Sequence, residues 1–209
     1  MKKRFLVITF LFVISVKGQV FNSFGLQVGP ALTNMKYPYA KDVFKTDDRA
    51  GLYLGLNGEL LKKKYFSLRA DIAYVQMGFK TDEIISSFSH PNGFVGPKDL
   101  RYDYIVFSPF VKLRYDYNHF SHYVLFGPYI GRCIKESVDF DPDFQEDLSR
   151  LKTAIGLNYG LGAMFQFSHL GLSLEIKRIT DLSGIFKSDD KVYNEGIFIT
   201  FGMNYSLSE

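Results

Sequence analysis

The sequence predicts an all-β fold: an eight-stranded antiparallel up-and-down transmembrane β-barrel, preceded by a cleavable signal peptide. Three observations lead to this prediction. Apolar and polar residues alternate with a period of two in eight segments, which is the period of a strand with two different faces. The connections between these segments are long and short in turn, as in outer-membrane barrels. One face of the segments carries almost no polar side chain.

The first 18 residues have the three-part pattern of a secretory signal peptide. Basic residues at positions 2–4 precede an apolar run at 5–16, and the small residue Gly18 follows. The apolar run is too short to cross a bilayer as a helix. We therefore expect cleavage after Gly18, which divides the chain into a signal peptide at 1–18 and one barrel domain at 19–209.

Charge and cysteine content exclude several classes of function. Four of the 25 basic residues lie in the signal peptide, so the mature chain has 21 basic and 22 acidic residues and a formal charge of −1. This balance argues against a nucleic-acid partner, which selects a basic domain. The single Cys133 excludes an internal disulfide and gives no cysteine-based metal site.

Four strands are expected in the first half of the mature chain, at 24–35, 50–61, 65–79 and 102–117. Each is long enough to cross a membrane, which takes about 9–11 residues. Their shared apolar face consists of Phe24, Leu26, Val28, Leu32, Leu52, Leu54, Leu56, Leu60, Phe66, Leu68, Ala70, Ile72, Tyr74, Ile105, Phe107, Val111 and Leu113.

Four further strands are expected at 122–133, 155–167, 170–180 and 196–207. Their apolar face consists of Val124, Phe126, Ile130, Leu157, Tyr159, Leu161, Ala163, Phe165, Leu172, Leu174, Ile176, Ile197, Ile199, Phe201, Met203, Tyr205 and Leu207. Three prolines, Pro30, Pro109 and Pro128, fall inside strands, where each removes a backbone donor. We expect local β-bulges around them.

The connections predict the orientation of the barrel. The second, fourth and sixth, "KKK", "DYNHFS" and "SHL", are short, and the other four are long. Long loops of outer-membrane barrels face the exterior and short turns face the periplasm. Both termini are therefore expected in the periplasm.

The opposite face of the strands is expected to line a narrow lumen. It consists mostly of Gly, Ser, Thr, Asn, Gln and Tyr, with few charges of nearly balanced sign. An eight-stranded barrel is just wide enough for its side chains to fill, and a buried charge needs a partner. We therefore predict a structural ion-pair network that plugs the lumen, formed by Glu59, Arg69, Asp71, Lys112, Arg114, Glu175 and Lys177.

No motif in the sequence predicts a catalytic, cofactor-binding or metal-binding residue. Three weaker alternatives are open: a metal held by His119, His122 and His169, a hydrolytic site that uses Ser89 and His90, and divalent ions at the acidic connection 136–147. Turn histidines and acidic loops are more often simply solvated. We expect no enzymatic activity and no cofactor.

Six segments of the mature chain resemble the PorT-like, porin-family outer-membrane β-barrels of Bacteroidetes. They read "FGLQVGPALTNM", "YFSLRADIAYVQMGFK", "IVFSPFVKLRY", "YVLFGPYIG", "GLNYGLGAMFQF" and "EGIFITFGMNYSL". The resemblance implies location in the outer membrane and, for some members, a role in secretion and assembly there. It supplies no catalytic motif.

The sequence is thus interpreted as a monomeric, non-enzymatic binding or assembly module of the cell envelope. Its expected partners are outer-membrane lipid and lipopolysaccharide, together with a protein of the envelope or secretion machinery. Three alternatives stay open: a small channel-forming porin, a soluble lipocalin-like ligand carrier whose polar face would point to water, and a lipid-modifying barrel enzyme.

Overall fold

The computed structural model describes residues 21–36, 46–81, 84–87, 90–95, 99–139, 153–184 and 193–207. For 84–87, 90–95 and 138–139 it describes the backbone alone. The expected signal peptide, Ser89, the side chain of His90 and most of the acidic connection lie outside the described parts of the chain. No described segment forms a helix long and apolar enough to cross a membrane.

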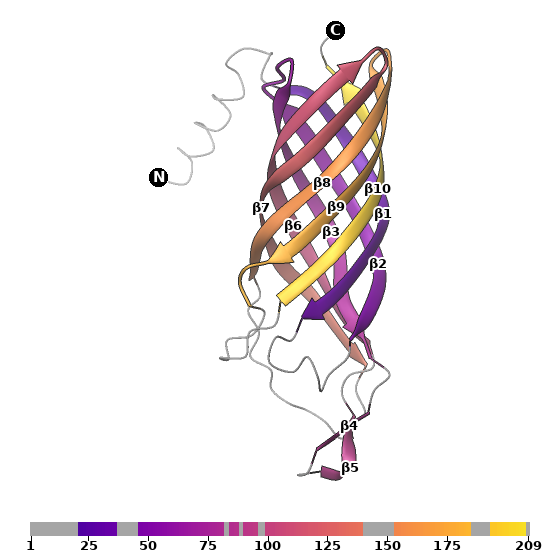
Figure 1. Ribbon diagram of the computed structural model, residues 1–209, viewed down its shortest axis with the longest axis vertical. Helices are drawn as coiled ribbons and strands as arrows, with labels where there is room; N and C mark the ends of the chain where they lie inside the picture. The colour runs from indigo at the N-terminus through magenta and orange to yellow at the C-terminus, as the bar shows by residue number, and fades with distance from the viewer. Residues whose placement is uncertain are drawn as a thin grey trace, which may run out of the picture.

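Eight strands form a closed antiparallel barrel in the order β1-β10-β9-β8-β7-β6-β3-β2 (Figure 1). Closure comes from the pairing of the first strand with the last. The barrel strands are β1 (Phe21–Lys36), β2 (Asp47–Leu60), β3 (Phe66–Lys80), β6 (Asp99–Tyr117), β7 (Phe120–Asp139), β8 (Thr153–Phe167), β9 (Leu170–Asp181) and β10 (Tyr193–Ser206). The predicted fold class is confirmed.

The three short turns lie at one end of the barrel, together with the start of β1 and the end of β10 (Figure 1). We call this the short-turn end and the opposite one the long-loop end. Asn118 and Ser168 take left-handed φ values of 52° and 48°, which closes two tight hairpins. The third connection contains a feature that the sequence reasoning missed, a separate hairpin of β4 (Ile84–Ser87) and β5 (His90–Val95).

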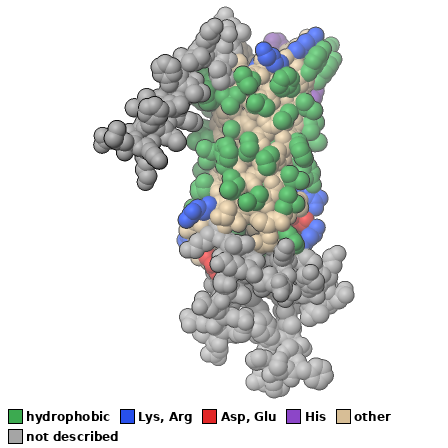
Figure 2. All heavy atoms as spheres, turned by 90° about the vertical axis from the view of Figure 1, so that its left-hand side faces the viewer, with side chains coloured by type: hydrophobic (Ala, Val, Ile, Leu, Met, Phe, Trp, Pro, Cys, Tyr) green, Lys and Arg blue, Asp and Glu red, His purple; other side chains and the backbone are tan. Residues whose placement is uncertain are grey.

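The alternation sorts the side chains between an apolar outer wall and the lumen. On β9, Ile176 is 47% exposed while the next residue, Lys177, is 0% exposed. The same contrast holds around the barrel, and apolar side chains cover the wall with few charges among them (Figure 2). In water this wall would be a very large apolar patch, which soluble monomers avoid.

Different side chains mark the two ends of the wall. Exposed aromatic residues surround the short-turn end: Phe21, Phe24, Tyr65, Phe66, Tyr115, Tyr117, Phe120, Phe167 and Tyr205. Partly exposed ion pairs lie toward the long-loop end, such as Arg101 with Asp103 at 2.7 Å and Lys36 with Glu195 at 2.6 Å. An apolar band with an aromatic girdle is typical of barrels that cross a membrane.

The prediction of bulges at the three strand prolines is wrong. The register is the same on both sides of Pro30, and also on both sides of Pro109 and Pro128. On the unchanged register, Pro109 of β6 and Pro128 of β7 lie opposite each other, in a gap of the ladder between Phe107 and Val111. The N–H donors that the two prolines lack are therefore missing at one place of the sheet instead of two. The strands keep their register there without the additional residue of a β-bulge.

Bulges occur elsewhere. In the β6–β7 ladder the register shifts between Asp103 and Tyr104, because β7 has one additional residue there. Shifts also occur between Phe21 and Ser23, and between Asp48 and Tyr53.

An arginine on the outer wall should reveal whether the wall faces lipid. Ile176 pairs with Leu161 and Ile199 in the middle of the wall, so Ile176→Arg should destabilise the barrel by about 2–4 kcal/mol. The control Tyr117→Arg, at the last residue of β6, should cost about 0–1 kcal/mol. The measurement is urea-dependent unfolding in lipid vesicles, followed on heat-modifiability gels. Equal costs for the two variants would show that lipid does not surround this wall.

Candidate functional site

The lumen is the candidate site, because it collects the charged residues that the sequence reasoning singled out. The structure places all seven of them inside the barrel, each at most 7% exposed. They come from β2, β3, β6 and β9 and form two clusters.

The central cluster joins opposite sides of the barrel. The guanidinium of Arg69 on β3 donates to both carboxylate oxygens of Asp71, at 2.7 and 2.9 Å, and to both of Glu175 on β9. Lys177 donates to Asp71 at 3.2 Å and lies 3.4 Å from Glu175. Two carboxylates and two cations thus satisfy one another where water is excluded.

Uncharged polar groups complete the central cluster. Lys177 also donates to Gln27 at 2.8 Å and to the Tyr53 hydroxyl at 2.9 Å, and the Tyr123 hydroxyl donates to Glu175 at 2.6 Å. The sequence reasoning placed Gln27 and Tyr53 on the lumen face but gave them no role. Such partners matter because a buried charge is tolerated only when its hydrogen bonds are made.

The second cluster lies nearer the short-turn end. Glu59 of β2 accepts from Lys112 at 2.6 Å and from Arg114 at 3.2 Å. Arg114 also donates to Asp116 at 3.1 and 2.6 Å, and Asp116 accepts from Ser121. Asp116 was missed, because it was assigned to the turn. Its position two residues after Arg114, and therefore on the same face, was the signal that could have found it.

The ammonium of Lys112 lies over the ring of Tyr123, 4.3 Å from its centre. Since Tyr123 also donates to Glu175, this residue connects the two clusters. Counting Asp116, the clusters contain four acidic and four basic side chains, so their charges cancel.

The half of the lumen toward the long loops is filled by an apolar cluster that the sequence reasoning did not predict. It consists of Ala31, Met35, Tyr53, Ala73, Val75, Met77, Phe79, Leu100, Tyr102, Tyr104, Val106, Tyr129, Ala154, Ile179 and Phe198. Its largest members are less than 2% exposed. The lumen is therefore filled by ion pairs toward the short turns and mainly by aromatic and aliphatic side chains toward the long loops.

A polar basin of about 350 Å³ opens at the short-turn end of the lumen. Lys62, Arg114, His119 and His169 are among the residues that line it. Desolvation, together with the nearby Arg114 charge, lowers the pKa of the Lys62 ammonium. Asp116, which pairs with Arg114 at 2.6 Å, also lines the basin, so its walls carry charges of both signs.

The alternative of a metal held by three histidines is not supported by the geometry. His119 and His169 both line the basin, but His122 points outward on β7. Among the described residues, no group of three or more His, Cys, Asp or Glu side chains is arranged to hold a metal ion. The Ser89–His90 alternative and most of the acidic connection fall outside the described side chains.

Comparison with known proteins finds no matching protein-family model and no matching curated protein. Several solved structures are similar in fold. Neisserial surface protein A superposes with a TM-score of 0.51 and 14% sequence identity, over 88% of this chain and 97% of that chain. The outer membrane protein OprG of Pseudomonas aeruginosa gives 0.49 and 12%, over 90% and 98%. The attachment invasion locus protein Ail of Yersinia pestis gives 0.44 and 15%, over 88% and 99%.

At these identities the similarity concerns the fold alone. The chain has the closed eight-stranded architecture of outer-membrane barrel proteins. The resemblance to the PorT-like family stays a prediction, because no family model matches.

Removal of one charge from the central cluster should test how strongly the charged side chains of this cluster depend on one another. Glu175→Gln leaves Arg69 and Lys177 with one carboxylate, so the free energy of unfolding should fall by about 3–5 kcal/mol. The matched control is Glu195→Gln, whose partners Lys36 and Arg178 are 56% and 46% exposed, so its loss should cost about 0–1 kcal/mol. Denaturant titration of both refolded variants gives the comparison. A loss below 1 kcal/mol for Glu175→Gln would mean that the cluster is not a coupled unit.

Proposed function

We propose that the chain is an integral outer-membrane barrel with a sealed lumen, which acts as a non-enzymatic binding or assembly module of the cell envelope. The observation that carries the proposal is the direction in which apolar and charged side chains point. Apolar residues cover the outside and an ion-paired network fills the inside.

The wall supports insertion into a membrane and argues against the soluble lipocalin-like carrier. A carrier needs a polar exterior and a cavity for its ligand. Here the exterior is apolar, and Arg69 and Glu175 meet across the lumen where a ligand would lie. The aromatic girdle at the short-turn end is what the interface of a bilayer selects.

The filled lumen argues against the small channel. An ion that crossed the barrel would have to separate the Arg69–Glu175 pair and then displace apolar side chains such as Tyr102 and Phe79. The lost ion pair and the lost apolar packing would not be replaced by equivalent contacts to the ion. Flux through the barrel is therefore not the activity that this interior favours.

A catalytic arrangement is also not favoured by the described side chains. The imidazole rings of His119 and His169 lie against the aromatic rings of Phe165 and Tyr205. A lipid-modifying enzyme would need a nucleophile beside an oriented base. The non-enzymatic alternative is the one that we propose.

With the lumen filled, a ligand or partner can bind only at the two ends of the barrel or on its outer wall. With the long loops outside and both termini in the periplasm, Arg101, Arg132, Lys135 and Arg178 would lie on the outer wall near the exterior surface. Arg101 and Arg178 already pair with Asp103 and Glu195, so Arg132 and Lys135 are the residues that we expect to bind the phosphate groups of lipopolysaccharide. The resemblance to PorT-like proteins adds a protein of the envelope or secretion machinery as a partner of the long-loop end.

Planar bilayers test the sealed lumen directly. The folded chain, verified by a gel band that shifts on boiling, should give no conductance steps, because the two ionic clusters and the apolar cluster close the path. An empty-detergent sample and a known open porin serve as negative and positive controls. Reproducible steps from the shifted species would replace the binding proposal with the channel.

Cysteine labelling tests the orientation. In a Cys133→Ser background, Asp48→Cys places a thiol at the long-loop end and Asn118→Cys places one in a short turn. A membrane-impermeant maleimide should label the first in intact cells and the second only after the outer membrane is permeabilised. The opposite pattern would place the long loops in the periplasm and overturn the proposed binding face.

A further inference from the structure

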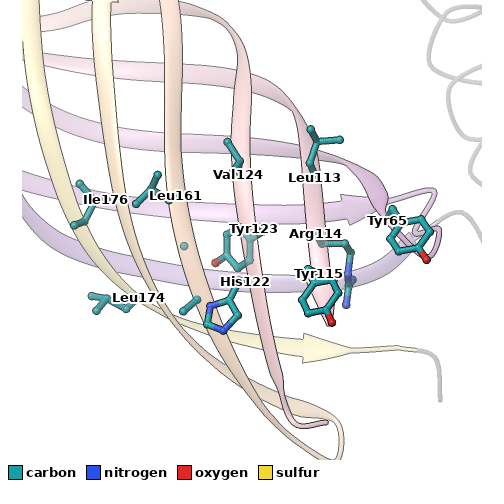
Figure 3. Close-up of a pocket in the computed structure, with 12 residues that line it drawn as sticks. Tyr65, Leu113, Arg114, Tyr115, His122, Tyr123, Val124, Leu161, Leu174 and Ile176 are labelled. Atoms are coloured by element: carbon teal, nitrogen blue, oxygen red, sulfur yellow. The ribbon is translucent and has the colours of Figure 1, made fainter. Parts of the chain in front are cut away.

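A groove of about 800 Å³ crosses the outer wall near the short-turn end (Figure 3). It lies along two rows of outward-facing residues that run from β6 to β9, roughly 14 Å at the usual strand spacing. The row nearer the turns is Tyr115, His122, Ala163 and Leu174, and the inner row is Leu113, Val124, Leu161 and Ile176.

A small outward-facing residue on β8 makes the groove deep. Ala163 stands between His122 and Leu174 in the register and has only a methyl group to fill that place. The preceding residue, Gly162, faces the lumen instead, where the ring of Tyr123 lies 2.5 Å from where its Cβ would be. The wall is therefore thin here and is backed from inside by Tyr123.

The two ends of the groove differ in chemistry. At one end Tyr65, in the turn between β2 and β3, accepts a backbone hydrogen bond from Arg114 at 2.8 Å. The ammonium of Lys64 lies 5.0 Å from the centre of the Tyr65 ring, and Lys62 and Lys63 precede it in the same turn. At the other end Ile176 lies in the apolar middle of the wall. The groove thus leads from a cationic rim into the lipid-facing surface.

We propose that this groove binds an acyl chain of an anionic phospholipid, with the lipid phosphate at the Lys64–Tyr65 rim. The inference rests on the proposed membrane location. Surrounding lipid is as apolar as the wall, so the hydrophobic effect gives the groove no advantage. The advantage comes from van der Waals contact on several sides of the chain and from the lysines of the turn. The Tyr115 hydroxyl and the His122 imidazole supply polar groups for the ester region of the lipid.

A second copy of the chain fits the same surface less well. A two-fold symmetric contact brings the same patch of both copies together. The lysine-rich turns at 62–64 would then approach each other without counter-charges. An anionic headgroup supplies those counter-charges.

Native mass spectrometry of the chain that begins at Gln19, extracted from outer membranes in a mild detergent, tests the groove. The wild type should retain one phospholipid. Ala163→Leu fills the groove from its floor and should lower the retained fraction at least fivefold. The matched control is Ala70→Leu on the outer face of β3, which adds the same bulk away from the groove and should retain the lipid.

The rim is tested with added vesicles that contain phosphatidylglycerol or phosphatidylethanolamine. The wild type should prefer the anionic lipid, and Lys64→Gln should lower this preference by about fivefold, the contribution of one lysine near an anionic surface. Equal lipid retention in Ala163→Leu and Ala70→Leu would overturn the proposal. So would a two-copy mass that Ala163→Leu abolishes.

The design separates this inference from the proposed function. Absence of the protein from the outer-membrane fraction, with no band shift on boiling, would refute the membrane barrel itself. A folded, heat-modifiable membrane barrel that retains no lipid selectively would refute the groove alone.

Discussion

The ion pair between Arg69 and Glu175 is the interaction on which the interior depends. In the closed order of strands, β3 and β9 are four strands apart in either direction, so the pair spans the full diameter of the barrel. It forms only when the barrel is narrow, closed and in this register. Tyr123 and Lys177 reach the same pair from β7 and β9. The lumen is therefore one connected unit rather than a channel with charged walls.

Such a network is better understood as a device for register than as a source of stability. The attraction within a buried ion pair does little more than offset the cost of desolvating its charges. Well-packed apolar residues would stabilise a core to the same degree. Alternation alone keeps each strand on the correct face, yet it permits slips of two residues. A slip of β9 by two residues would leave Glu175 and Lys177 facing the lumen but would separate them from Arg69 and Asp71. Each of the eight charges has its partners only in the observed register, so the network disfavours registers shifted by two residues.

Alternation explains how much of the structure could be predicted. It assigned the lumen face of all eight strands, and hence the positions of Lys112 and Arg114, because the period of a strand is fixed locally. The partners of these charges could not be predicted, since alternation gives the face of a residue but not which lumen side chains meet: Glu59 of β2 reaches Lys112 of β6 across β3. The prolines were misjudged for the same reason, because only the pairing of β6 with β7 brings Pro109 opposite Pro128. The acidic connection and the Ser89–His90 pair lie outside the described side chains, so they stay predictions.

A sealed interior restricts where recognition can take place. When charges fill one half of the lumen and aromatic residues the other, a ligand meets only the two ends and the outer wall. Large apolar side chains cover most of the wall, so the place where Ala163 lies between His122 and Leu174 is a distinct hollow in its surface. Gly162, the residue before Ala163, faces the lumen and makes room for Tyr123, which donates to Glu175 and lies beneath the ammonium of Lys112. The packing of the interior and the shape of the outer groove thus depend on two neighbouring residues of β8 that face opposite sides, so Ala163 can be enlarged without filling the lumen.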